Sequence, residues 1–223
     1  MGRPAALSRD LILAAAAALV EEHGAEALSA RRLGDALGCD PSALYRHFAN
    51  MDDLQREVGD RFLASVRVQA RTGEAWQAAV RRICIELRAE QLRHPRMAAL
   101  VRAAPTRLTN ELRITEALLR ELRRGGFEVD GAAAAYHALI ELTVGAAAID
   151  ATLAAETAAQ RRRAYREWRA AYAALDATEF PHAVAVAAHL YDGTADRRFE
   201  WALDALLDGL VARSARTAGD ARP

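Results

Sequence analysis

The chain of 223 residues is 52% hydrophobic and 27% charged, a composition that fits a globular protein and excludes a disordered one. Its thirty basic residues, all of them arginine, balance thirty acidic residues, so the overall charge favours neither a nucleic acid nor any other class of partner. Alanine accounts for 54 residues while valine, isoleucine and aromatic residues are sparse, and this balance predicts an all-α fold.

Short helices with strong capping residues are predicted at the start of the chain. A serine is the expected N-cap of helices over residues 8–22 and 29–37, and Gly38 stands where the second helix needs a left-handed residue at its end. A third helix is expected over residues 41–48, with proline at its first position, and Asn50 caps a fourth.

The helices become longer after about residue 55. They are expected over residues 76–93, 97–103, 110–124, 131–155, 160–174 and 197–213. Residues 132–148 are almost free of charge, so we expect the fourth of these helices to be buried on most sides. The change in helix length predicts two domains, residues 1–55 and residues 56–223.

The second and third helices are joined by very few residues, one of them a glycine, and such a connection makes two helices cross steeply, as in a helix-turn-helix. Leu44 and Phe48 lie four residues apart and share the face that docks onto the first two helices. At about 100° per residue, Ser42, Ala43 and Arg46 then point away from the core. This outer face can enter a DNA major groove, although a helical hairpin with ordinary polar residues outside has the same pattern.

Residues 28–48 resemble the signature of the TetR (tetracycline repressor) family of bacterial transcription regulators: an N-capped helix, a Leu-Gly turn and a recognition helix containing Leu-Tyr-x-His-Phe. Residues 50–54 are similar to the capped fourth helix of that pattern, and residues 199–203 and 207–210 resemble the dimerising last helix of its tetracycline-repressor-like branch. The resemblance implies an N-terminal three-helix helix-turn-helix domain followed by a larger helical ligand-binding and dimerisation domain.

The resemblance also implies a sequence-specific DNA-binding transcriptional regulator. It would be a repressor that binds a palindromic double-stranded DNA operator as a homodimer and is released by an unidentified small-molecule effector. The residues expected to contact DNA are Arg31, Arg32, Pro41, Ser42, Ala43, Tyr45, Arg46 and His47. Before residue 51 the chain has five arginines and six acidic residues, so its net charge there is slightly negative and we expect weak non-specific affinity for DNA.

Polar residues that interrupt otherwise apolar helices are expected to line an effector cavity. They are Arg102, Arg113, Glu116, His137 and Glu141. The dimer interface is expected on two helices, because the alanine-rich one permits close approach and the last one carries a broad apolar face. Its predicted residues are Gly145, Ala148, Phe199, Leu203, Leu207 and Leu210.

An all-helical enzyme or small-molecule carrier is the alternative hypothesis. No nucleophile elbow, phosphate-binding loop or dinucleotide fingerprint occurs in the sequence. His137 and Glu141 have the spacing of two metal ligands on one helix face, but a polar pair facing a cavity or solvent is the commoner arrangement. We therefore expect no catalytic residues, no metal site and no cofactor.

Two cysteines, Cys39 and Cys84, are too few for a disulfide framework and match no zinc-binding spacing. Charged residues bracket the alanine-rich stretch near the N-terminus, so it does not read as a signal peptide. Nowhere do 18 consecutive apolar residues indicate a membrane span. These features predict a cytoplasmic protein that makes no contact with a membrane.

Overall fold

The computed structural model describes residues 7–103, 105–154 and 157–220, and within these ranges it is helical and contains no strand. The N-terminal elements are α1 (Arg9–His23), η1 (Ala25–Ala27), α2 (Ala30–Leu37), η2 (Pro41–Arg46) and α3 (Met51–Leu63). They are followed by α4 (Trp76–Arg93), α5 (Pro95–Ala103), α6 (Thr109–Arg124), α7 (Val129–Ala154), α8 (Ala158–Ala173), α9 (Pro181–Val186), η3 (Ala187–His189) and α10 (Ala195–Asp220). The all-α prediction is confirmed.

The N-terminal helices begin at the predicted capping residues. Ser8 Oγ accepts a hydrogen bond from Leu11 N–H at 3.2 Å, and Asn50 Oδ1 accepts one from Asp53 N–H at 2.8 Å. Gly38 ends α2 in the left-handed region, with φ at 64°. These local contacts satisfy backbone groups that the helix itself leaves unpaired, and they fix where α1, α2 and α3 start or stop.

The recognition segment differs from its prediction. Residues 41–48 were expected as an α-helix, whereas the structure has the shorter 3₁₀-helix η2. With about three residues per turn instead of 3.6, the side chains rotate relative to the α-helical expectation. Ala43 consequently turns inward beside Leu44 and is only 8% exposed, so the prediction that it points away from the core is wrong. Leu44 and Phe48 are buried as predicted.

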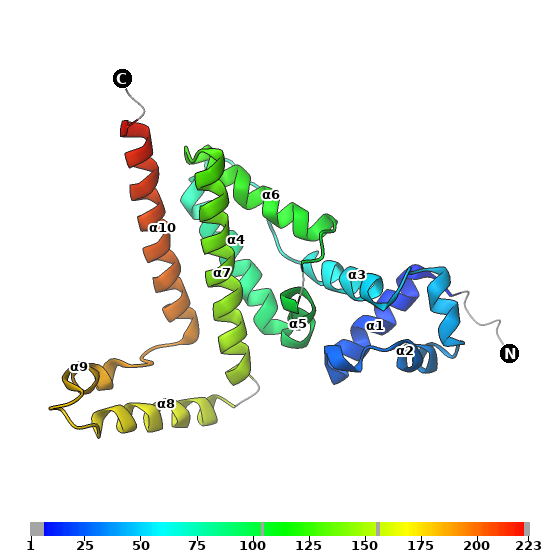
Figure 1. Cartoon of the computed structure of the whole chain (residues 1–223), viewed down its shortest axis with the longest axis horizontal. Helices are drawn as coiled ribbons and strands as arrows, with labels where there is room; N and C mark the ends of the chain where they lie inside the picture. The colour runs from blue at the N-terminus through cyan, green and yellow to red at the C-terminus, as the bar shows by residue number, and fades with distance from the viewer. Residues whose placement is uncertain (1–6, 104, 155–156, 221–223) are drawn as a thin grey trace.

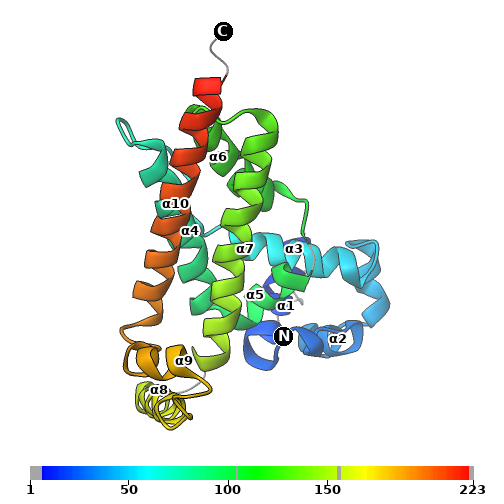
Figure 2. The same ribbon diagram turned by 60° about the vertical axis from the view of Figure 1, so that its left-hand side comes forward.

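The helices α4 to α7 and α10 surround a common core. In Figures 1 and 2, α7 and α10 run side by side over much of their length, and α4 packs against both of them as well as against α6. The helices α1 and α2 lie at the opposite end of the molecule from α10, and α3 leads from them to contacts with α5 and α6 (Figure 1). The arm formed by α8 and α9 lies across one end of α7 and α10.

The central helix α7 is less buried than its sequence predicted. One side packs against α4, α6 and α10, but His137 and Glu141 are exposed on the other side and Ile149 is 69% exposed. Residues 129–152 also have the length and apolar composition of a membrane span, but core helices of soluble proteins have the same length and composition. The expectation of burial on most sides is therefore wrong for the single chain.

Candidate DNA interface and effector domain

The helices α2 and η2 form one exposed surface because Gly34 lets them approach closely. A Cβ atom at this position would lie 2.9 Å from the Cys39 carbonyl oxygen and 3.1 Å from Pro41 Cγ. The turn between the helices closes with a hydrogen bond from Cys39 N–H to the Gly34 carbonyl at 3.0 Å. Gly34 therefore positions the recognition segment, a role that the sequence analysis missed. A glycine inside a helix could have indicated it, because glycine destabilises a helix and is usually found there only where close packing requires it.

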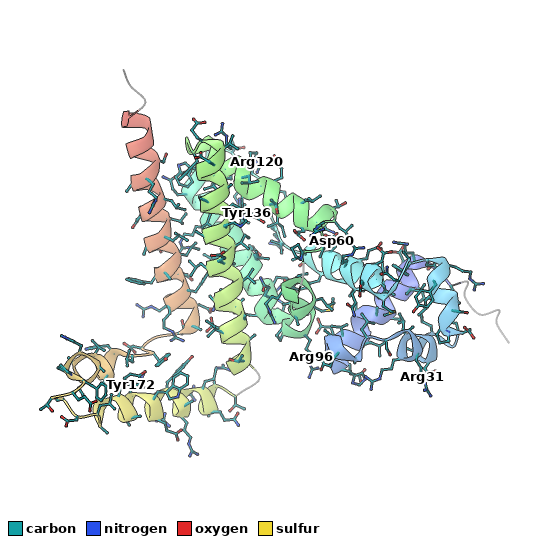
Figure 3. All side chains as sticks on the ribbon, in the orientation of Figure 1. Arg31, Asp60, Arg96, Arg120, Tyr136 and Tyr172 are labelled. Atoms are coloured by element: carbon teal, nitrogen blue, oxygen red, sulfur yellow. The ribbon has the colours of Figure 1, made fainter. Side chains whose placement is uncertain are left out.

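Three arginines project from this surface without a partner. Arg31 and Arg32, in the first turn of α2, and Arg46, at the end of η2, are exposed. Among residues 7–103, 105–154 and 157–220 no hydrogen bond or ion pair engages their guanidinium groups. Figure 3 shows Arg31 pointing outward from the edge of α2. Their charges are thus available to an external anion.

Other predicted DNA-contacting residues surround these arginines. Ser42 is exposed and Tyr45 is 49% exposed, while Pro41 and His47 are half-buried. The Asp40 carboxylate accepts hydrogen bonds from the Ser42 hydroxyl and the Ser42 N–H, and these bonds lower the pKa of Asp40. Only Ala43 is turned away from the surface.

Two acidic residues near this surface pair with arginines outside it. Glu57 binds the Arg9 guanidinium, whose cation also lies 4.3 Å from the centre of the Phe48 ring. Asp10 pairs with Arg61 at 3.0 Å. Asp35 on α2 and Asp40 before η2 are exposed and form no ion pair with any residue that the structure describes, so the α2–η2 face carries two free carboxylates beside its three free arginines and has a small net positive charge.

Two sets of contacts join the N-terminal elements to the rest of the chain. Arg96, at the start of α5, donates to the carbonyls of Glu21 and Glu22 at 2.7 and 2.9 Å, at the end of α1. Asp60 on α3 is 7% exposed, and its carboxylate accepts hydrogen bonds from the N-terminus of α6. Figure 3 labels Arg96 and Asp60 at these two junctions. The orientation of α1 and α3 is thus tied directly to α5 and α6.

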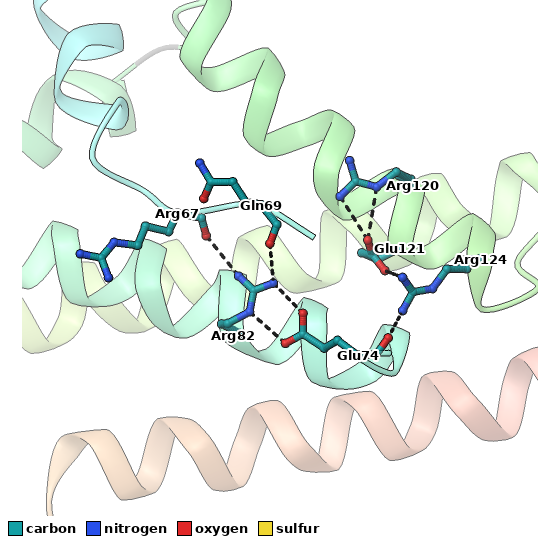
Figure 4. Close-up of polar contacts among 7 residues, drawn as sticks. All are labelled: Arg67, Gln69, Glu74, Arg82, Arg120, Glu121 and Arg124. Atoms are coloured by element: carbon teal, nitrogen blue, oxygen red, sulfur yellow. Dashed lines mark hydrogen bonds and ion pairs between the residues drawn. The ribbon is translucent and has the colours of Figure 1, made fainter. Parts of the chain in front are cut away.

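The segment between α3 and α4 is held by Arg82. Its guanidinium donates to the carbonyls of Arg67 and Gln69 at 3.4 and 3.1 Å and forms a two-point ion pair with Glu74 at 2.9 and 2.8 Å (Figure 4). The pairing raises the pKa of Arg82 and lowers that of Glu74. Arg124, at the end of α6, donates to the Glu74 carbonyl from the other side. The connection is therefore anchored to α4 and α6.

The predicted effector residues do not form one cavity. Glu116, His137 and Glu141 are exposed, and Arg113 donates to the Leu63 and Ala64 carbonyls at 3.2 and 3.3 Å. None of the five predicted residues lines any of five prominent cavities among the described residues. A polar residue in an apolar helix can lie on its outer face, and sequence alone does not reveal which face is covered.

The remaining predicted effector residue, Arg102, donates through Nη2 to the Pro95 carbonyl at 3.4 Å, but its other terminal nitrogen is one of several buried polar atoms without a partner. Its Nη1 atom and the Oε1 atom of Gln91 form no hydrogen bond within the part of the chain that the structure describes. The Thr143 hydroxyl has no partner of normal geometry there either, and lies beside the weakly polar Cys84 thiol. Burial lowers the pKa of Arg102. These groups come from α5, α4 and α7, which pack against one another.

The predicted dimer residues of α10 lie inside the protomer. Phe199, Leu203, Leu207 and Leu210 are between 0% and 7% exposed and belong to the core. Placing them on the dimer surface was wrong: their spacing marks a buried face, and that face is covered by helices of the same chain. The outer face of α10 instead carries Trp201, which is 75% exposed.

The predicted dimer residues of α7 lie at its partly open side. Gly145 and Ala148 are half-buried, and a Cβ atom at Gly145 would meet nothing within 4 Å. The same is true of Gly209 on α10. Small residues on both helices thus leave room for another helix.

Two family models match the chain. The model described as "Bacterial regulatory proteins, tetR family" covers residues 12–58, and the one described as "Tetracyclin repressor-like, C-terminal domain" covers residues 70–214. An HTH-type transcriptional regulator of Saccharopolyspora erythraea is 30% identical over 161 residues, which are 72% of this chain and 68% of that protein. Tetracycline repressor protein class E of Escherichia coli is 29% identical over 64% of this chain and 68% of its own length.

Solved structures show the same architecture. Apo ActR from Streptomyces coelicolor superposes with a TM-score of 0.84 at 27% identity, covering 97% of this chain and all of that one. The complex of the same protein, a TetR family member, with actinorhodin gives a TM-score of 0.84 at 28% identity, covering 94% of this chain and 99% of that one.

Proposed function

Because this chain belongs to the TetR family of bacterial regulatory proteins, we propose that it represses transcription by binding a palindromic operator as a homodimer and releases the operator when a small molecule binds. It is a DNA-binding transcriptional regulator with an N-terminal helix-turn-helix and a helical C-terminal domain. The observation that carries the proposal is the exposed α2–η2 face with three unpartnered arginines. Repression of this kind places the protein in the cytoplasm and requires no catalytic group.

The exposed residues divide into two roles on DNA. Arg31, Ser42 and Arg46 face the bases, where an arginine can donate two hydrogen bonds to a guanine. Arg32 contacts the phosphate backbone, as do Tyr45 and His47 at the flanks, with Pro41 beside them. Ala43 takes no part, because its side chain is buried on the inner side of η2.

The dimer forms through the outer faces of α7 and α10. Gly145, Ala148 and Gly209 permit close approach of the helix backbones, and the exposed Trp201 ring supplies apolar area. Two copies of each helix give a four-helix interface. A symmetric dimer would present two α2–η2 faces to the two halves of a palindrome.

The effector binds among α4, α5 and α7, next to Gln91, Arg102 and Thr143. Buried polar groups in native proteins are normally hydrogen-bonded, so the unpaired atoms of Gln91, Arg102 and Thr143 are available to a ligand. The surrounding core is apolar, which favours a small molecule that is mostly hydrophobic and carries a few hydrogen-bonding groups. The structurally similar ActR has been crystallised with actinorhodin, which shows that this architecture can hold a small molecule.

Selection of genomic DNA fragments by the purified protein tests the proposal. A repressor enriches fragments that share one palindromic sequence, and the variant with Arg31, Arg32 and Arg46 all changed to alanine enriches none. Arg163→Ala, which removes an exposed arginine of α8, serves as the control and retains the selection. If the wild-type protein enriches no common sequence, the alternative of an all-helical enzyme or carrier is favoured.

A further inference from the structure

The arm after α7 carries an aromatic cluster that neither the DNA face nor the proposed effector site uses. Tyr165 and Trp168 lie on α8, and Tyr191 follows η3. The rings of Tyr165 and Tyr191 are stacked with their centroids 5.4 Å apart, and the Trp168 ring lies 4.6 Å from that of Tyr191. Trp168 and Tyr191 remain 42% and 37% exposed, and α8 has no buried residue. The cluster is therefore open to solvent in the protomer.

The backbone at Tyr191 is held in an unusual conformation. Its φ is 56°, a left-handed value that residues other than glycine seldom adopt. Arg198 fixes the turn by donating to the Gly193 carbonyl at 3.3 Å and to the Tyr165 hydroxyl at 3.0 Å, and Arg169 donates to the Leu190 carbonyl. Backbone strain that the surrounding contacts enforce is found preferentially at functional sites. The turn thus presents the Tyr191 ring in a defined position.

Two cavities meet at this cluster, and Arg162, Tyr165 and Gly193 line both of them. The larger, of about 620 Å³, is an open cleft lined by residues of α4, α7, α8 and the start of α10. The smaller, of about 210 Å³, lies between α8 and the turn that contains Tyr191. The larger volume falls within the range of about 300–1,000 Å³ that is usual for small-molecule sites.

The free charge of this site is positive. The carboxylates of Asp150 and Asp196, which line the larger cavity, both bind the buried Arg88 guanidinium at 2.6 and 2.7 Å. Arg162 and Arg166 line the smaller cavity, and neither forms a hydrogen bond or ion pair with any residue that the structure describes. Asp192 lines the same cavity and accepts a hydrogen bond from Gly193 N–H, so the arginines outnumber the single carboxylate there. An occupant would therefore meet two free guanidinium groups and an aromatic surface. In Figure 3 the arm is the part of the molecule around the label of Tyr172, a residue of α8.

We propose that this arm pocket, formed by Arg162, Tyr165, Arg166 and Tyr191, binds a planar aromatic anion such as an aromatic carboxylate. The acid group pairs with the two arginines, and the ring packs against the tyrosine rings. The size of the larger cavity, which residues of four elements line, favours a small molecule over a nucleic acid strand. The smaller cavity is lined only by residues of α8 and of the turn that contains Tyr191, and neither Gln91 nor Arg102 lines either cavity, so the arm pocket is a second ligand site.

Calorimetric titration of the full-length protein tests the proposal with 2-naphthoate and its uncharged analogue 2-naphthamide. The arm pocket should bind 2-naphthoate, and the Arg162→Ala/Arg166→Ala variant should lose this site or bind at least about tenfold more weakly. Arg163→Ala is the matched control: Arg163 lies on the same helix, lines neither cavity and pairs with Glu167, so binding should be unchanged. The amide should bind more weakly than the acid.

Three results would overturn the proposal. They are equal binding of acid and amide, undiminished 2-naphthoate binding by the double variant, and a double variant that is no longer dimeric in light scattering. The last result would show that the partner subunit occupies the pocket. Because Arg162 and Arg166 are exposed and unpaired, circular dichroism should show an unaltered fold in every variant.

Discussion

The carboxylate of Asp60 on α3 is hydrogen-bonded to Asn110 at the start of α6, to the backbone N–H at 3.1 Å and to Nδ2 at 2.9 Å. The same carboxylate accepts from Glu111 N–H at 3.0 Å and from the Thr106 hydroxyl at 3.1 Å. Leu108, the residue in the N-cap position of α6, supplies no side-chain cap. Asp60 therefore serves as the N-cap of α6, although it belongs to α3, whereas Ser8 caps α1 from the adjacent position. Separating α3 from α6 would leave the first amides of α6 without a hydrogen-bond acceptor.

Replacing Asp60 with alanine should lower the free energy of unfolding by about 1–3 kcal/mol, because the half-buried amides of Asn110 and Glu111 lose the carboxylate that accepts their hydrogen bonds. Asp60→Asn keeps one oxygen acceptor and should lose less. Urea denaturation measures both values. Equal stability of wild-type protein and Asp60→Ala would show that α6 does not depend on this cap.

The two arginines at the start of α2 should differ in their effect on DNA binding. Arg31→Ala should relax sequence preference at one symmetric pair of operator positions, since a base contact by arginine provides about 1–3 kcal/mol of discrimination. Arg32→Ala should weaken binding to all sequences alike and reduce the logarithmic salt dependence by about 0.9 per lost phosphate contact, hence roughly two units per dimer. Titrations of operator variants at several salt concentrations separate the effects. If Arg31→Ala changes only the salt dependence, the placement of α2 on DNA is wrong.

Two substitutions on α10 should act through different surfaces. Trp201→Arg changes an exposed side chain, so it should leave the helix content intact and yield a monomer that no longer binds a palindrome. Leu203→Ala removes a fully buried side chain and should reduce the free energy of unfolding of the protomer by about 2–5 kcal/mol. Light scattering and circular dichroism distinguish these outcomes. A Trp201→Arg protein that remains dimeric would place the interface elsewhere.

Gln91→Met should stabilise the protein and at the same time weaken its response to the effector. The side chain is 1% exposed and its carbonyl oxygen has no hydrogen-bond partner in the described chain, so an apolar side chain of similar shape removes a desolvation cost. We expect the ligand-free protein to become more stable by up to about 1 kcal/mol, while compounds that release the wild-type repressor lose potency. Thermal unfolding and DNA release measure the two effects. Glu116→Ala, at an exposed position, should change neither.

The two cysteines should react differently with iodoacetamide. Burial raises the pKa of Cys84 to about 11, so almost no thiolate is present at pH 8, and the side chain is inaccessible as well. Cys39 is half-buried in the α2–η2 turn and should be modified first. Mass spectrometry of the native protein after brief labelling reads out both sites. Rapid labelling of Cys84 would mean that the packing of α4 against α7 opens readily.

The helix boundaries were predictable because they are set by neighbouring residues. Ser8, Ser29 and Asn50 all cap the helices assigned to them, since an N-cap needs only its own side chain and an amide two or three positions later. The burial of Leu44 and Phe48 was also predicted correctly. Ala43 was not, because the choice between an α-helix and a 3₁₀-helix changes the direction of a side chain without changing the sequence signature.

The errors in the C-terminal half have another origin. The spacing of Leu203 and Leu207 shows that the residues are buried, but does not show whether the covering helix belongs to the same chain. His137 interrupts an apolar helix, yet it lies on the exposed side of α7. Both questions depend on contacts between elements distant in sequence, and these contacts also determine that Gln91 is left without a partner.

The anchoring of residues 67–74 by Arg82 also has a consequence for the operator. A flexible linker would let each DNA-binding domain of a dimer reach its half-site independently. Here the hydrogen bonds of Arg82 fix the connection between the domains. The separation of the two recognition segments is then set by the protein, and the DNA must match it. One additional base pair between half-sites turns one of them by about 34–36° around the double helix. We therefore expect the dimer to bind operators with one spacing between the half-sites and to bind operators that are one base pair longer or shorter much more weakly.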